Sequence, residues 1–182
     1  AILGNFVNRA VVLTHKYFGG PLPAAGSLRP VDEQLIADVA ATRDALTAAL
    51  DTFHFREALK QAMEIARLGN RYLQETEPWK LAKTDMERVK TILNTAIQLC
   101  GNLAVAFEPF LPFMSGKLCR MLGLENLSWN EIGRMDLIPA GAQIGQAELL
   151  FDKIEDDAIA AQLQRLQDTK KANELAAWRP EP

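Results

Sequence analysis

Hydrophobic residues recur every three to four positions along most of this chain, the spacing that places them on one face of an α-helix. The first such face consists of Leu3, Phe6, Val7, Ala10, Val11, Thr14, Tyr17 and Phe18. We expect this helix to end at Gly19-Gly20, because glycine readily adopts the conformation that follows a helix. Asn5 and Arg9 lie four residues apart on the opposite side of the helix, so we expect both side chains to be exposed.

The same periodicity resumes after a loop at 19–30, which contains three prolines and three glycines. It predicts helices at about 32–51, 55–74 and 85–107, a helix opened by Pro109 and Pro112 and closed by Gly123, and a short helix that starts at Ser128. The helix at 55–74 is expected to bury its apolar face, which consists of Phe55, Leu59, Ala62, Met63, Ala66 and Leu73. The helix at 85–107 is apolar over a wide arc, which is typical of a central helix, and Thr84 is its expected N-cap.

The character of the chain changes after Arg134. Residues 137–145 have the composition of an extended stretch with turns, and a polar amphipathic helix is expected to follow residues 149–154 and to run to about Gln167. We therefore predict an all-α antiparallel helix bundle over 1–134 and a C-terminal arm over 135–182. An apolar cluster too large to leave exposed is expected to fold the arm back on the bundle, and it consists of Leu149, Leu150, Phe151 and Ile154. The last dozen residues of the arm are expected to be frayed.

Composition and charge narrow the classes of function. The chain has 182 residues, of which 48% are hydrophobic and 24% are charged, an ordinary globular composition. No apolar run reaches the roughly 20 residues that a membrane span needs. The formal net charge of −3 argues against nucleic-acid binding through a broad basic field, but it leaves room for a small site that reads a few bases.

Candidate catalytic and metal-binding residues are few. Cys100 and Cys119 are the only cysteines, and both fall in apolar helical patterns, as expected of small buried side chains in the reducing cytoplasm. His15 and His54 have no companion at the spacing of a metal site. The sequence contains no Gly-rich phosphate loop, nucleophile elbow or convincing Ser/His/Asp set. We therefore predict no catalytic residue, no metal site and no cofactor in this chain.

A second informative segment is Asn70-Arg71-Tyr72-Leu73-Gln74-Glu75-Thr76-Glu77-Pro78-Trp79-Lys80, in which an amphipathic helix runs into a proline and then an indole. A planar amide, a guanidinium and a tryptophan held near one another can stack on an unpaired base and hydrogen-bond its edge. Other interpretations remain open from the residues alone. Trp79 can be a lid on the hydrophobic core, Asn5 and Arg9 a solvated strip, and Asn70 a buried amide that ties two helices together.

Three segments, in order, resemble the C-terminal half of methionyl-tRNA synthetases. They are 3–20 with its Leu3-Gly4-Asn5 start, 70–80 with Asn-Arg-Tyr and Pro-Trp, and 150–155, which reads Leu-Phe-Asp-Lys-Ile-Glu. The resemblance implies an α-helical anticodon-binding domain of a class I aminoacyl-tRNA synthetase. In that family the residues matching Asn5 and Arg9 hydrogen-bond anticodon bases, and the residue matching Trp79 stacks on the wobble cytosine of the CAU anticodon. The resemblance further implies that Pro78 positions the indole and that Asn70 supports the pocket.

By the same resemblance, the longer parent protein joins methionine to tRNA with ATP, while this segment binds the anticodon loop of tRNA(Met) and contacts its own catalytic domain. The catalytic domain, with its ATP site and any zinc, is expected outside this segment. The missing initiator methionine and the absence of a capping residue before Ile2 agree with a segment of a longer protein. A homodimer through other regions stays open. The alternatives are an anticodon domain of another class I synthetase for an apolar amino acid, a helical interaction module anchored by Trp79, and a small helical enzyme.

Overall fold

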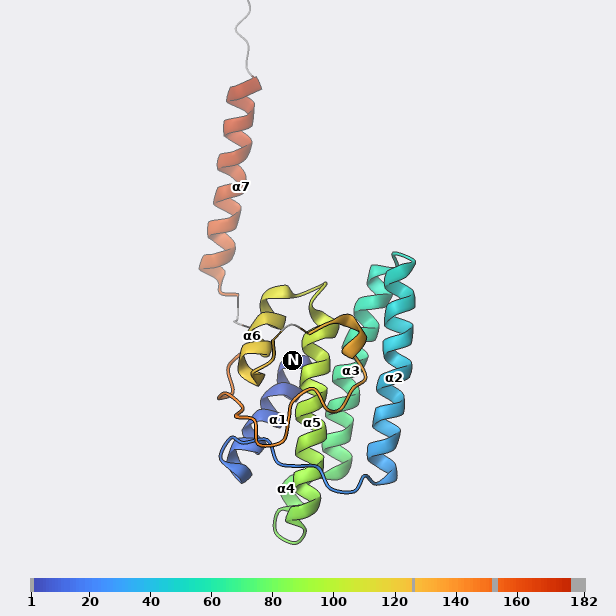
Figure 1. The fold of residues 1–182 in the computed structure, drawn as a ribbon. Coiled ribbons are helices and arrows are strands. Elements are labelled where there is room, and N and C mark those ends of the chain that lie inside the picture. The colour runs from blue at the N-terminus through green and yellow to red at the C-terminus, as the bar shows by residue number, and fades with distance from the viewer. Residues whose placement is uncertain (1, 126, 152–153, 178–182) are drawn as a thin grey trace, which may run out of the picture. The chain divides into compact units, whose positions relative to one another are not determined.

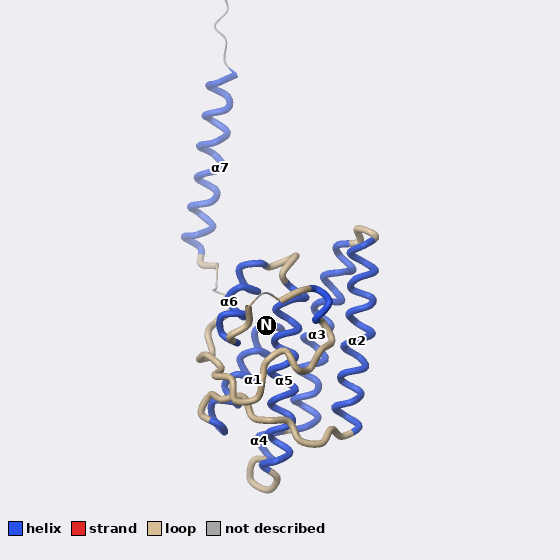
Figure 2. Tube along the Cα trace, in the orientation of Figure 1, coloured by secondary structure: helices blue, strands red, loops and turns tan. Residues whose placement is uncertain are grey.

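Helices account for most of the residues that the computed structural model describes, which are 2–125, 127–151 and 154–177 (Figures 1 and 2). In chain order they are α1 (Ile2–Phe18), α2 (Pro30–Asp51), α3 (Phe55–Thr76), α4 (Pro78–Leu81), α5 (Met86–Phe107), α6 (Pro112–Leu122), a 3₁₀ turn (Trp129–Glu131) and α7 (Asp156–Ala177). Within the described residues, extended pairing is limited to one isolated bridge between Pro21 and Gln143. The predicted all-α class is confirmed. None of the described helices is long and apolar enough to cross a bilayer.

Helix α5 is the centre of the bundle. Every residue from Arg88 to Phe107 except Lys90 is buried, and the helix packs against α1, α3, α4 and α6. This agrees with the wide apolar arc of its sequence. Cys100 is part of this core, where burial raises the pKa of its thiol, so it behaves as a small apolar side chain.

The expected N-cap of α5 was misplaced by one residue. Asp85 holds the cap position, and its carboxylate accepts a hydrogen bond from the Arg88 backbone N–H at 3.0 Å. Thr84 instead closes the preceding turn, where its N–H donates to the carbonyl of Leu81. Both residue types are good caps, and the helix begins where the backbone geometry lets the Asp85 side chain reach a free N–H.

The predicted burial of Phe55 and Leu59 is wrong. These side chains are 59% and 40% exposed, whereas Ala62, Ala66 and Leu73 on the same face are buried. The first turns of α3 line an open apolar surface rather than the core, together with Leu50, Met63, Phe107, Pro109, Phe110 and Leu111. Helical periodicity identifies the inward face of a helix, but it does not say how far the neighbouring helices extend along that face.

The segment 135–150 packs against the bundle. Ile138 and Ile144 are buried, and the amide side chain of Gln98 on α5 bonds both the N–H and the carbonyl of Ile138, at 3.0 and 2.7 Å. The Leu22 N–H donates to the Ala142 carbonyl at 2.9 Å. The first compact unit accordingly ends at Leu150, rather than at the boundary drawn after residue 134. Leu150 is half-buried against the core, but Leu149 is 73% exposed, so its expected burial is wrong.

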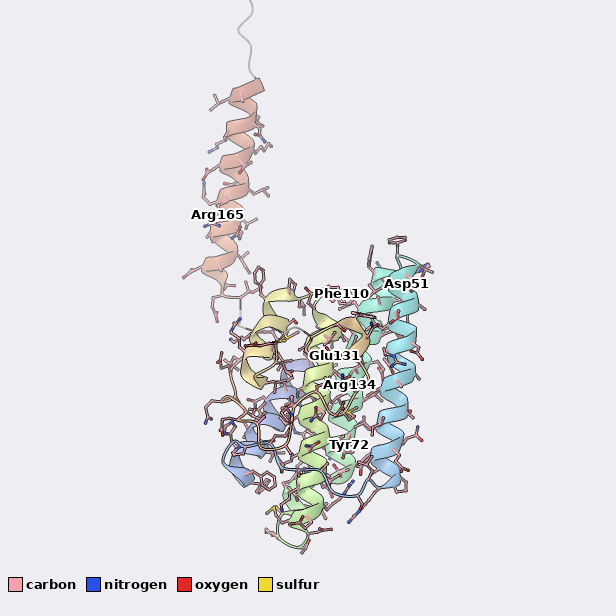
Figure 3. The ribbon with its side chains drawn as sticks, in the orientation of Figure 1. Asp51, Tyr72, Phe110, Glu131, Arg134 and Arg165 are labelled. Carbon is pink, nitrogen blue, oxygen red and sulfur yellow. The ribbon has the colours of Figure 1, made fainter. Side chains whose placement is uncertain are left out.

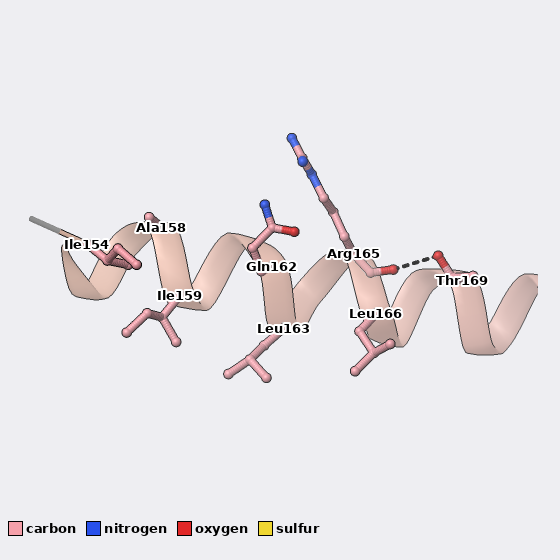
Figure 4. Close-up of a pocket in the computed structure, with 8 residues that line it drawn as sticks. All are labelled: Ile154, Ala158, Ile159, Gln162, Leu163, Arg165, Leu166 and Thr169. Atoms are coloured by element: carbon pink, nitrogen blue, oxygen red, sulfur yellow. Dashed lines mark hydrogen bonds between the residues drawn. The ribbon is translucent and has the colours of Figure 1, made fainter. Parts of the chain in front are cut away.

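The second unit, from Phe151 onward, contains α7. This helix continues to Ala177, ten residues past its expected end at Gln167. One side of it carries Ile159, Leu163 and Leu166, while Gln162 and Arg165 point elsewhere (Figure 4). Residues 171–177 are helical, and the other residues for which fraying was predicted, 178–182, lie outside the described part of the chain. The predicted packing of Phe151 and Ile154 on the bundle stays a prediction.

A fully buried ion pair connects three helices of the bundle. Arg88 on α5 makes two hydrogen bonds to the carboxylate of Asp32 on α2, at 2.5 and 2.7 Å. The hydroxyl of Tyr72 on α3 (Figure 3) donates to the same carboxylate at 2.6 Å. Burial by itself raises the pKa of Asp32, but the hydrogen bonds from Arg88, the Arg29 backbone and Tyr72 outweigh it and lower that pKa below its ordinary value.

Removing the charge of Asp32 is expected to destabilise the bundle in a pH-dependent way. Asp32→Asn leaves Arg88 buried without a counter-charge, which costs about 3–5 kcal/mol of unfolding free energy at pH 7. Because the folded pKa of Asp32 is lowered, its contribution is present above the unfolded pKa of about 3.9 and is lost as the pH falls further. Urea unfolding at pH 7 and pH 3 measures this. Asp51→Asn, an exposed change on the same helix, is the control. A difference in unfolding free energy between the wild type and Asp32→Asn that is as large at pH 3 as at pH 7 would contradict the interpretation.

Candidate nucleic-acid interface

The right-handed helical conformation is interrupted between α3 and α4 at Glu77. This residue has φ 41° and ψ 57°, a left-handed conformation that costs a non-glycine residue roughly 1–2 kcal/mol. The following residue, Pro78, disfavours a right-handed helical conformation at Glu77 and occupies the first position of α4. The expectation that Pro78 ends the helix is therefore correct, but the short helix that it starts was not foreseen. Pro78 is buried, and Trp79 is half-buried on this helix.

Trp79 lies against Arg9 of α1, and the expectation that Arg9 is exposed is wrong, because this contact leaves it half-buried. The guanidinium carbon is 5.2 Å from the centre of the indole ring, a cation–π geometry. Among the described residues, no carboxylate forms an ion pair with Arg9, so its hydrogen-bond donors are not committed to an acid. Two predicted site residues that are 70 positions apart in the sequence are thus neighbours in the structure.

Asn5 and Asn70 form a second contact between α1 and α3. The side-chain N–H of Asn5 donates to Oδ1 of Asn70 at 3.2 Å. The Nδ2 group of Asn70 donates in turn to the backbone carbonyls of Ile2 and Ala66, each at 3.0 Å. Asn5 is exposed and Asn70 is half-buried. Asn70 therefore ties two helices together, as the alternative interpretation had it, and it does so at the edge of the candidate site.

Asn5, Arg9 and Asn70 border one shallow hollow on the surface between α1 and α3, whereas Trp79 is not part of its lining. Its lining consists of Ile2, Asn5, Arg9, Arg67, Asn70, Arg71 and Gln74. The residues from α3 follow the spacing i, i+3, i+4 and i+7, which places them on one stripe of the helix. Arg67 and Gln74 were not among the site residues predicted from the sequence, although the polar stripe beside Asn70 was the available signal.

The other positive charges around the hollow are already paired. Arg67 forms an ion pair with Glu64 at 3.0 Å, Arg71 with Asp38 at 3.0 Å, and Lys80 with Glu77 at 2.8 Å. Within each pair the two opposite charges largely cancel, so the pair exerts little electrostatic field at a distance. The surface is therefore suited to short-range stacking and directional hydrogen bonds more than to long-range attraction of phosphate, which agrees with the net charge of the chain.

A glycine permits the close approach of the two helices. A Cβ atom added at Gly69 would lie 2.6 Å from the ring of Phe6, far inside van der Waals contact. Gly69 immediately precedes Asn70, and Phe6 immediately follows Asn5. The absence of a side chain at position 69 thus brings the two amides within hydrogen-bonding distance.

Gly69→Ala is expected to lower the unfolding free energy by about 1–3 kcal/mol, because the new methyl group overpacks the contact with Phe6. Ordinary helix propensity predicts the opposite sign, a gain of roughly 1 kcal/mol. Gly116→Ala on α6 is the matched control, since its Cβ would meet only Arg120 at 3.6 Å, and we expect it to be neutral or stabilising. Thermal unfolding of both variants decides between steric conflict and propensity, and a stabilised Gly69→Ala would refute the packing argument.

A family model and individual relatives of known sequence all match this chain as the same kind of protein. A sequence model of the family described as the anticodon binding domain of methionyl tRNA ligase matches residues 22–171. The methionine–tRNA ligases of Parabacteroides distasonis and Porphyromonas gingivalis strain W83 are both 59% identical to this chain over its whole length. That of Cytophaga hutchinsonii is 53% identical over 97% of the chain. The chain spans about 27% of the length of the first two relatives.

Solved structures show the same fold. The crystal structure of the apo form of Mycobacterium tuberculosis methionyl-tRNA synthetase aligns with a TM-score of 0.73 and 20% identity, covering 85% of this chain and 32% of that one. The structure of the same enzyme bound by methionyl-adenylate aligns with a TM-score of 0.72 and 21% identity, covering 83% and 31%. At this level of identity the likeness concerns the fold and not individual side chains.

Proposed function

Because this chain belongs to the family of anticodon-binding domains of methionyl-tRNA ligases, we propose that it recognises the CAU anticodon of tRNA(Met). The observation that carries the proposal is the meeting of Asn5, Arg9, Asn70 and Trp79, predicted from segments far apart in the sequence, on one surface of the bundle. The relatives named above are all methionine–tRNA ligases, which favours this amino acid over the others whose class I synthetases have similar openings.

The geometry suggests separate tasks for these residues. Trp79, held on a helix that begins at the buried Pro78, offers part of its indole for stacking on an unpaired base, which we take to be the wobble cytosine. Arg9 and Asn5 project from a rigid helix and supply directional hydrogen bonds to base edges. Stacking is tolerant of base identity, so the selectivity comes from the hydrogen bonds.

The alternative of a protein-interaction module has less support. A tryptophan that anchors a partner protein is normally surrounded by other apolar groups. Trp79 instead adjoins Arg9 and a hollow lined mostly by polar side chains. The exposed apolar surface around Phe55 and Leu111 involves other parts of the bundle.

The activity of the longer protein is also a proposal, since this chain spans only about 27% of its first relatives. We propose that a catalytic domain elsewhere in that protein joins methionine to tRNA in the cytoplasm, with ATP and any zinc bound there. The domain described here would contact that catalytic domain and contribute tRNA recognition without a catalytic residue. Any homodimer of that protein would form through regions outside this chain.

Stacking on Trp79 is testable with an RNA hairpin that carries the CAU anticodon loop. Trp79→Ala is expected to weaken hairpin binding by about 1–3 kcal/mol, roughly 5- to 150-fold, because a stacking surface is lost. Trp79→Phe keeps an aromatic face and is expected to lose less. Fluorescence anisotropy with a labelled hairpin measures both. Equal affinity of the wild-type domain for a hairpin with an unrelated anticodon would overturn the proposed function.

In a full-length ligase containing this domain, the same substitution is expected to separate the two half-reactions. Trp79→Ala lowers kcat/KM for charging of methionine tRNA, but it leaves methionine-dependent pyrophosphate exchange almost unchanged, because adenylate formation does not involve the anticodon. The isolated domain is expected to show no exchange. Exchange activity in the isolated domain, or an equal loss in both reactions of the variant, would contradict the assignment.

A further inference from the structure

The hydrogen bonds of Asn70 determine the orientation of two side-chain amides. One terminal atom of Asn70 lies 3.0 Å from both the Ile2 and the Ala66 carbonyl oxygens. Carbonyl oxygens only accept hydrogen bonds, so that atom must be Nδ2 and the other must be Oδ1. The Asn5 atom that faces Oδ1 of Asn70, at 3.2 Å, must then be the donor, Nδ2. It follows that Asn5 directs Oδ1, an acceptor, away from Asn70.

A fixed amide distinguishes bases that a freely turning amide does not. Cytosine and adenine carry an exocyclic amine, a donor, at the place where uracil and guanine carry a carbonyl, an acceptor. An asparagine that can turn its amide by 180° presents oxygen to the first pair and nitrogen to the second. An asparagine held with its oxygen outward accepts from the amine and leaves the carbonyl without a donor, and an unsatisfied buried acceptor is costly.

We propose that Asn70 is a positioning residue that holds the Asn5 amide with its oxygen outward, so that Asn5 selects an amino base, cytosine or adenine, over a keto base. This inference rests on the proposed function, because it requires that an RNA base enters the hollow. In a CAU anticodon the base concerned is the first or the second, and not the third.

The composition of the hollow makes Asn5 the suitable acceptor. Its three arginines, Arg9, Arg67 and Arg71, only donate, and one lone pair of Asn70 Oδ1 already accepts a hydrogen bond from Asn5. The remaining side-chain acceptors of the lining are Oδ1 of Asn5 and Oε1 of Gln74. Gln74 is exposed, and within the described residues no hydrogen bond holds its amide, so it is free to turn and cannot discriminate in this way. Gln74 is therefore a control within the same hollow.

The test measures base discrimination rather than affinity alone. The domain is titrated with the CAU hairpin, with a hairpin whose first base is uracil, and with one whose second base is guanine. Each change swaps an amine for a carbonyl without altering ring size. At one of these two positions, Asn70→Ala is expected to reduce the preference for the amino base by about three- to tenfold, the effect of one lost hydrogen bond. Gln74→Ala is expected to change the affinity for all three hairpins by one common factor, and so to leave both preferences unchanged, because its amide is not held in one orientation.

Two further variants separate positioning from a merely structural role. Asn70→Asp keeps an acceptor for the Asn5 N–H, so it is expected to preserve the preference even though its loss of donors lowers stability and its charge weakens binding to all hairpins. In the Asn5→Ala background, Asn70→Ala is expected to cause no further loss of preference, since it acts through Asn5. Thermal unfolding is recorded for every variant.

The results of these experiments distinguish failure of this inference from failure of the proposed function. The inference is overturned if Asn70→Ala weakens all three hairpins by one factor, if Asn70→Asp loses the preference as Asn70→Ala does, or if the double variant loses it additively. Failure of the wild-type domain to prefer the CAU hairpin over an unrelated one overturns the proposed function itself, and this inference with it.

Discussion

The architecture of the bundle depends on the buried charges of Asp32 and Arg88. Neither charge is tolerable in the core alone, so α2 and α5 must lie where the two groups meet with bidentate geometry. Tyr72 adds α3 to the same point through its hydroxyl. Unlike apolar contacts, which allow small shifts between helices, these directional bonds permit only a narrow range of helix positions. The C-terminal turns of α3 are thereby held in place, and the candidate site is built on them.

A few short contacts connect this ion pair to the candidate site. Tyr72 is only two residues from Asn70, and Gly69 lets α1 approach closely enough for Asn5 to bond that residue. One turn further along α1, Arg9 reaches Trp79 on α4. The site is therefore carried by helices rather than by mobile loops, which is the arrangement that directional recognition of a base requires. Under the proposed function, a domain with a net charge of −3 reads RNA in this way because the specificity lies in contacts of a few ångströms.

The comparisons with relatives and the geometry support different parts of the conclusion. The family is established by sequence similarity over the whole chain, and the fold by likeness to solved synthetase structures. The proposed roles of individual side chains rest on the resemblance seen in the sequence together with the contacts in this structure. The orientation of the Asn5 amide, in particular, follows from the acceptors around Asn70 and from no property of the family.

The sequence by itself determined where the long helices of the bundle lie, which face of α1 is buried, and that Asn5 projects outward, because helical periodicity is a local property of neighbouring residues. It also pointed to Trp79 through the Pro-Trp pair. Only the tertiary structure decided that Asn5 meets Asn70, that Gly69 is needed for that contact, that Phe55 and Leu59 stay exposed, and that Asp32, Tyr72 and Arg88 form one network. These features join residues on different helices or depend on how far those helices extend, and no periodic pattern within one helix encodes the position of another.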